Sequence, residues 1–139
     1  MKVILDTNVF ISGIFFSGPP YRILQAWRDG LIKLALTGKI LEEYRRVAEQ
    51  LHRQFPAINL QRIFELLIIN AEIVPDQHLP VTICADPDDD KFIACALTAR
   101  CKVIVSGDKH LLNIPTYRGI KVVTPRIFVE TYLKRPHKN

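Results

Sequence analysis

The stretch KVILDTN, residues 2–8, decides the fold of this chain. Its apolar run contains Val3 and Ile4, whose β-branched side chains favour an extended backbone. No polar residue interrupts the run before Asp6, as is typical of a strand buried on both faces of a parallel sheet. We therefore expect Lys2–Leu5 to form such a strand, with Asp6 at its carboxyl end.

Helical and strand patterns alternate along the rest of the chain. The clearest helix is Lys39–Phe55, where apolar residues recur every three or four positions until Pro56. Asp86 and Pro87 supply the cap and the first turn of another helix, which runs to about Ala99. This alternation predicts an α/β fold, with a mostly parallel sheet that helices cover on both faces. The other expected strands are 34–36, 72–74, 102–106 and 120–123, and the other expected helices are 9–16, 20–29, 60–70, 108–112 and 125–133.

The composition is that of one basic domain. The chain has 139 residues, and its 19 Lys and Arg against 14 Asp and Glu give a net charge of +5. Hydrophobic residues make up 48% of it, so a core can form without disulfides or structural metal. A basic surface is compatible with nucleic acid as a partner. We expect a single domain over 1–134 and a basic, flexible tail over 135–139.

The sequence also indicates a compartment. The longest apolar run, Leu66–Ile69, has four residues, far fewer than a membrane span requires. No signal peptide is expected, because only Val3–Leu5 separate Lys2 from Asp6. The three cysteines are scattered without metal-ligand spacing, as in a protein of a reducing compartment. We therefore expect a cytoplasmic protein that does not contact a membrane.

Two acidic residues directly follow expected strands. Asp6 ends the first strand, and Asp108 comes just after the strand at 102–106 and Gly107. In open α/β sheets, ligands bind beyond the carboxyl ends of the strands, near the point where the strand order reverses. If these two strands are neighbours at that point, both carboxylates face one crevice.

A third acidic residue lies on the expected helix Lys39–Phe55. At 100° per residue, Glu43 lies at the margin of the apolar stripe, whereas Glu42 and Glu49 point towards solvent. Glu43 is therefore the acid of this helix that can turn towards a crevice.

Four acidic residues crowd positions 86–90. Helix capping and the helix dipole explain Asp86 and Asp88, but they explain the whole run poorly because its charges repel one another. Asp89 and Asp90 both lie beside apolar positions of their helix. We expect one or both of them to turn inward, and helical geometry does not choose between them.

Carboxylates that meet at one place require a counter-charge to remain ionised. Ligation by oxygen alone suits Mg²⁺ or Mn²⁺, with water and phosphate oxygens completing the shell. Two such ions can clamp a phosphodiester, activating a water on one side and stabilising the leaving oxygen on the other. A basic chain with an acidic, metal-loaded crevice is suited to phosphodiester hydrolysis.

Four motifs follow one another along nearly the whole chain: Asp6-Thr7-Asn8-Val9, Leu41-Glu42-Glu43-Tyr44, the run from Asp86 to Ala94, and the run from Ser106 to Leu112. In their order and spacing they resemble the PIN domain family, especially the toxin components of bacterial toxin–antitoxin pairs. The resemblance implies a three-layer α/β/α domain with a parallel sheet of four or five strands. It also implies a metal-dependent endoribonuclease that acts on RNA with Mg²⁺ or Mn²⁺, with a possible antitoxin protein as partner and a homodimeric state.

The family's four acids carry over, motif by motif, to Asp6, Glu43, Asp90 and Asp108. The resemblance selects Asp90 over Asp89 because two residues separate the family's acid from the Ile-Ala pair of its helix. We expect Asp6 to bridge or anchor the principal metal, with Asp90 and Asp108 completing the ligation directly or through water. Glu43 would hold a ligand or orient the attacking water. The residues expected to support this set or to act as additional ligands are Asn8, Asp86, Asp89 and Ser106.

Each of these residues also has a plainer explanation when taken alone. Asp6 can cap a strand end, Asn8 can belong to a turn, and Asp108 can cap a helix. A haloacid-dehalogenase phosphotransferase requires a second Asp where Asn8 stands, a receiver domain requires an Asp on a central strand, and no nucleotide-binding glycine motif is present. The alternative that remains is a metal-bound, catalytically weak module that binds RNA or an antitoxin.

Overall fold

A five-stranded, wholly parallel sheet forms the centre of the domain, in the order β3-β2-β1-β4-β5. The computed structural model describes residues 1–80 and 82–133. The expected parallel α/β fold is confirmed, and the expected basic tail at 135–139 lies outside the described residues. The strands are β1 (Lys2–Leu5), β2 (Lys33–Thr37), β3 (Glu72–Val74), β4 (Val103–Val105) and β5 (Lys121–Val123).

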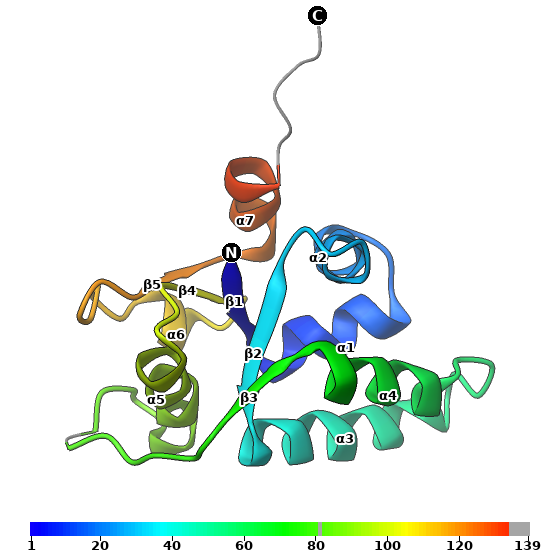
Figure 1. Ribbon diagram of the computed structural model, residues 1–139, viewed down its shortest axis with the longest axis horizontal. Coiled ribbons are helices and arrows are strands. Elements are labelled where there is room, and N and C mark those ends of the chain that lie inside the picture. The colour runs from blue at the N-terminus through cyan, green and yellow to red at the C-terminus, as the bar shows by residue number, and fades with distance from the viewer. Residues whose placement is uncertain (81, 134–139) are drawn as a thin grey trace, which may run out of the picture.

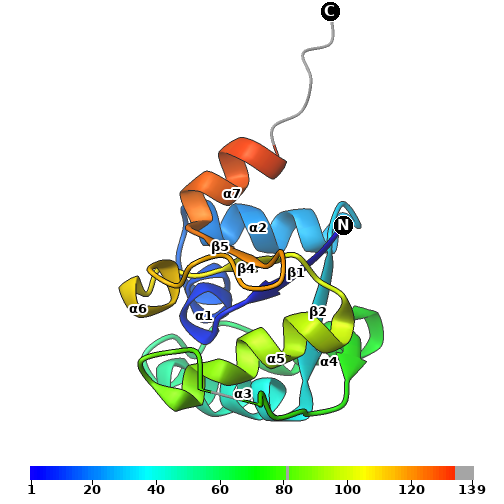
Figure 2. The same ribbon diagram turned by 90° about the vertical axis from the view of Figure 1, so that its left-hand side faces the viewer.

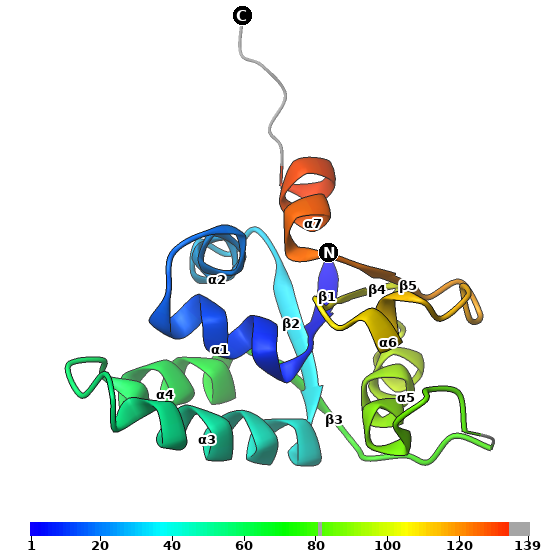
Figure 3. The same cartoon turned by 180° about the vertical axis from the view of Figure 1, so that it is seen from behind.

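Helices lie on both sides of the sheet and give a three-layer arrangement (Figure 1). On one side α5 packs against β1, β2, β3 and β4. On the other side lie α1 to α4, as the view from behind also shows (Figure 3). The helices are α1 (Thr7–Phe15), α2 (Pro19–Arg28), α3 (Gly38–His52), α4 (Leu60–Asn70), the 3₁₀ turn η1 (Pro87–Asp89), α5 (Asp90–Ala99), α6 (Lys109–Leu112) and α7 (Pro125–Tyr132).

The strand order reverses beside β1, at the centre of the sheet. From β1 the chain passes through α1 and α2 to β2 on one side, and from β3 it returns through α5 to β4 on the other. The register pairs Leu5 with Val105, so that β1 and β4 end side by side. The two strands that precede Asp6 and Asp108 are therefore neighbours at the switch point.

A buried aromatic pair attaches α3 to the end of β1. The ring of Tyr44 stacks on that of Phe10, with centroids 4.3 Å apart, and both side chains are almost fully buried. The hydroxyl of Tyr44 donates a hydrogen bond to the carbonyl of Leu5, the last residue of β1. This contact fixes the rotation of α3 and thereby places Glu43 towards the end of β1.

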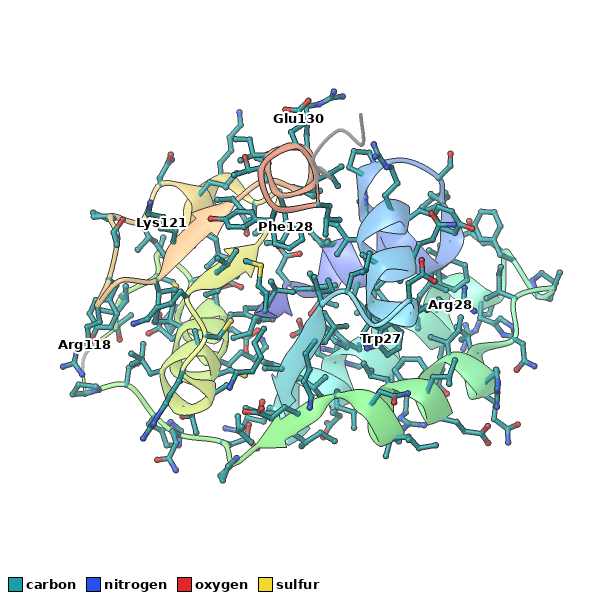
Figure 4. The ribbon with its side chains drawn as sticks, turned by 45° about the horizontal axis from the view of Figure 1, so that its top comes forward. Trp27, Arg28, Arg118, Lys121, Phe128 and Glu130 are labelled. Carbon is teal, nitrogen blue, oxygen red and sulfur yellow. The ribbon has the colours of Figure 1, made fainter. Side chains whose placement is uncertain are left out.

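The helices α2 and α7 pack against each other at the end of the domain where the N-terminus lies (Figure 1). Phe128 of α7 is fully buried and points into the domain, whereas Glu130 points away from it (Figure 4). Trp27 of α2 is buried as well. No helix in residues 1–80 and 82–133 is long and apolar enough to cross a membrane.

Most boundaries lie within two residues of the sequence-based expectation, and two differ by more. The long helix ends at His52 instead of Phe55, because a ring nitrogen of His52 lies 2.9 Å from the carbonyl oxygen of Ile58 and the chain turns there. The helix expected to begin at Asp86 opens as a 3₁₀ turn and becomes α-helical only at Asp90. This second difference changes which acidic side chain faces inward.

Candidate metal centre

Carboxylates from four separate elements line one pocket of about 230 Å³. They come from the end of β1, from α3, from η1 and from the residue that caps α6. The elements that carry them, α1, α3, α6 and the beginning of α5, gather at one side of the molecule (Figure 2). The lining residues are Asp6, Thr7, Asn8, Glu43, Arg46, Val47, Asp89, Phe92, Asp108 and Leu111.

Asp6 is the most deeply placed of these acids, with 5% of its surface exposed. One carboxylate oxygen accepts a 2.9 Å hydrogen bond from the backbone N–H of Val9 and so caps α1. The other accepts from the hydroxyl of Ser106. Burial is the largest influence on the pKa of Asp6 and raises it, and the nearby carboxylates of Asp108 and Glu43 raise it further. The two hydrogen bonds lower the pKa, but the net shift is upward.

Ser106 joins the acids that follow the two central strands. Its side chain is fully buried, and while its hydroxyl donates to Asp6, its oxygen accepts a 2.9 Å hydrogen bond from the backbone N–H of Asp108. Asp108 in turn accepts a 2.9 Å hydrogen bond from the N–H of His110, which caps α6. The buried serine therefore fixes the backbone at Asp108 relative to the carboxylate of Asp6.

Glu43 is held by side chains from two other helices. Its Oε1 atom lies 2.8 Å from the ammonium of Lys91 on α5, and its Oε2 atom accepts from the hydroxyl of Thr7 on α1. The guanidinium of Arg46 lies 3.9 Å from Oε1. None of these three partners was expected from the sequence, although Thr7 stands in the same motif as Asp6.

Asp89 faces the pocket and is influenced by its acidic neighbours. The pKa of Asp89 is raised to about 6, mainly by burial and then by the carboxylates of Asp86 and Asp108. The ammonium of Lys91 lowers this pKa and offsets part of the shift. This effect of Asp108 reflects the position of both acids on the same pocket.

Asp90 does not line this pocket. Its carboxylate accepts hydrogen bonds from the backbone N–H groups of Ile83, at 3.1 Å, and Cys84, at 2.7 Å, and it lines a neighbouring pocket beside Lys39. Asp89 belongs to the 3₁₀ turn and Asp90 begins α5, and of the two only Asp89 lines the pocket together with Asp6. The structure therefore assembles a carboxylate set that differs from the expected one at this position.

The two remaining supporting candidates occupy different places. Asn8 is exposed and lines the pocket. Asp86 is exposed, accepts a 3.0 Å hydrogen bond from the N–H of Asp88 and caps η1. Asp86 therefore acts on the pocket through its charge on Asp89 rather than as a lining residue.

The pocket suits a divalent cation by its chemistry, although it is not preassembled. In residues 1–80 and 82–133, no three carboxylate, imidazole or thiol groups already lie close enough together to enclose an ion. All candidate ligands are oxygens, as Mg²⁺ and Mn²⁺ prefer. The raised pKa values of Asp6 and Asp89 reflect burial and negative charge without sufficient compensation. A cation in the pocket would supply that compensation.

A larger pocket of about 540 Å³ lies at the opposite ends of the strands. Its wall includes Trp27 and Arg28 (Figure 4), and no Asp, Glu, His or Cys is among its lining residues. It therefore lacks the groups for hydrolytic chemistry, which are gathered at the smaller pocket.

Comparison with known proteins agrees with this fold. The family model described as PIN domain matches residues 2–110. The uncharacterized protein MJ1680 of Methanocaldococcus jannaschii is 29% identical over 147 aligned positions, which cover 96% of this chain and 93% of that protein. The matched region includes all four carboxylates of the pocket.

The raised pKa of Asp89 predicts a pH-dependent stability. The pKa of Asp89 is about 6 in the folded state, whereas its ordinary value is 3.8. At pH values between these two, folding is therefore accompanied by the uptake of a proton. As the pH rises through this range, Asp89 ionises in the folded state and the fold loses stability. In EDTA, we expect Asp89→Asn to raise Tm at pH 7.5 and to leave it nearly unchanged at pH 3.5. Thermal unfolding followed by circular dichroism measures both, with the exposed Asp29→Asn as control. A gain that is equal at both pH values would contradict this electrostatic account.

Proposed function

Because this chain belongs to the PIN domain family, whose members are generally nucleases, we propose that it is a metal-dependent endoribonuclease. The observation that carries this proposal is the convergence of four carboxylates, from four elements, on one pocket at the switch point of the sheet. The net charge of +5 supports RNA as the substrate, because the surface around an acidic pocket can still attract a polyanion.

Asp6, Asp89 and Asp108 are the proposed ligands of Mg²⁺ or Mn²⁺, and Asp89 takes the place expected for Asp90. A divalent cation bound there supplies the charge that activates a water and stabilises the leaving oxygen of the phosphodiester. Ser106 and the end of α1 hold the carboxylate of Asp6 in place. Glu43 is proposed either to contact the ion or to orient the attacking water.

RNA cleavage is the direct test of this function. With a labelled single-stranded RNA and a labelled structured RNA, we expect cleavage with Mg²⁺ or Mn²⁺ and none with EDTA. Asp6→Asn should lower the rate by at least about 10²-fold, since metal assistance is worth several kcal/mol. Gel analysis of the products over time measures both effects. Binding of RNA without cleavage by the wild-type chain would instead favour the binding-module alternative.

A pair of neighbouring variants tests the choice of ligand on η1. Asp89→Asn should weaken Mn²⁺ binding at least about tenfold, because it removes a proposed ligand. Asp90→Asn should change it less than about threefold, since its carboxamide oxygen can still accept from the N–H of Cys84. Isothermal titration calorimetry of the folded proteins measures both affinities. The reverse order of effects would restore Asp90 to the ligand set.

The proposal also includes a homodimer. The helix α4 and the edge strand β3 carry three exposed isoleucines, and exposed apolar surface of this kind is typical of an interface. We expect light scattering to give the mass of a dimer, and Ile69→Lys, at a side chain that is 76% exposed, to give a monomer. Ile127→Lys on α7 is the matched control. A wild-type monomer at all concentrations would exclude this part of the proposal.

We further propose that the nuclease is cytoplasmic and is the toxin of a toxin–antitoxin pair. The three buried free cysteines suit a reducing compartment. Co-expression with the product of a short neighbouring gene should yield a stable complex with inhibited cleavage. Cleavage unaffected by that product would leave the nuclease without the toxin role.

A further inference from the structure

One cation lies beside the carboxylate pocket and is paired with one of its acids. The ammonium of Lys91 lies 2.8 Å from Glu43 Oε1 and 2.6 Å from Asp88 Oδ2, and it also donates to the backbone carbonyl of Asp88 at 3.0 Å. An ammonium has three N–H donors, so these three acceptors use all of them. The Lys91 side chain is only 14% exposed, which makes the ion pair stronger than one at the surface.

Both oxygens of Glu43 are engaged by this chain's own side chains. Lys91 binds Oε1, and the hydroxyl of Thr7 binds Oε2. Each oxygen keeps a further lone pair, but a divalent ion bound to Glu43 would lie close to the ammonium of Lys91, whose like charge repels it. Glu43 therefore differs from Asp6, whose two hydrogen-bond partners, the N–H of Val9 and the hydroxyl of Ser106, carry no charge.

The other three carboxylates of the pocket have no such cation. Among residues 1–80 and 82–133, the ion pairs that reach the pocket's acids all involve Glu43, and none involves Asp6, Asp89 or Asp108. The four acids thus divide into one that is already neutralised and three that are not.

We propose that Lys91 is a positioning residue that keeps Glu43 out of the metal shell, so that the ion binds through Asp6, Asp89 and Asp108 alone. This inference rests on the proposed function and decides the role left open there for Glu43. With its oxygens held by Lys91 and Thr7, Glu43 faces the pocket as a fixed acceptor that can orient a water.

A double-mutant cycle on Mn²⁺ binding tests this role without measuring catalysis. In the wild-type background, Glu43→Gln should change the Mn²⁺ Kd by less than about threefold, since Glu43 is not a ligand. In a Lys91→Gln background Glu43 is released to the ion, so Glu43→Gln should there weaken Mn²⁺ binding by at least about tenfold. Calorimetric titration of the full chain, in all four combinations, gives the coupling.

Two controls separate a specific effect of Lys91 from a loss of local charge or structure. Arg46→Gln removes a cation that lies 3.9 Å from the same oxygen and is 62% exposed, and Glu43→Gln should remain without effect in that background. Lys91→Arg retains the charge and should behave as the wild type. Circular dichroism melts show whether each variant is folded, and if Lys91→Gln is not, Lys91→Met takes its place in the cycle.

The outcomes are distinct. A tenfold or greater loss of Mn²⁺ affinity on Glu43→Gln in the wild-type background overturns the inference, as do equal effects of that change with and without Lys91. If Mn²⁺ does not bind the wild-type chain and RNA is not cleaved in any metal, the proposed function fails together with it. Metal-dependent cleavage with a cycle that shows no coupling leaves the nuclease intact and removes only the role of Lys91.

Discussion

The site depends on the parallel pairing of β1 with β4. This pairing aligns Leu5 with Val105, so the residues that follow both strands emerge at the same edge of the sheet. Ser106 then fills the space between them, donating to the carboxylate of Asp6 and accepting from the backbone of Asp108. Without this register, Asp6 and Asp108 would not line the same pocket. A slip of one residue would also move each side chain of the strand to the opposite helical layer and disrupt the packing there, which favours a single register.

The second constraint is electrostatic. Gathering four carboxylates into one pocket is costly, and the chain compensates for only part of the cost. Lys91 and Arg46 neutralise Glu43, and hydrogen bonds to Ser106 and Val9 partly stabilise Asp6. The part of the electrostatic cost that is not compensated is seen in the raised pKa values of Asp6 and Asp89. A site that retains unfavourable charge in this way is typical of function rather than of stability, and a divalent cation is the ligand that would relieve it.

Much of this arrangement could be predicted from the sequence, because its signals are local. Asp6 and Asp108 follow strands whose apolar character is plain, and the helical period of α3 places Glu43 at the edge of its buried stripe. Local sequence signals do not decide whether Asp89 or Asp90 lines the pocket. That depends on the 3₁₀ turn and on the backbone of Ile83 and Cys84, to which Asp90 is bonded. The partners of Glu43 were missed for the same reason, since Thr7 and Lys91 meet it only when three helices pack together.

The most direct test of the central claim, that the carboxylate pocket binds a divalent metal, is the position of the metal itself. Anomalous diffraction from crystals of the chain grown with Mn²⁺ locates the ion without reference to activity. The account predicts a peak within bonding distance of Asp6, Asp89 and Asp108, with Glu43 still paired to Lys91. A pocket without a peak at saturating Mn²⁺, or an ion bound only elsewhere on the protein, would contradict it.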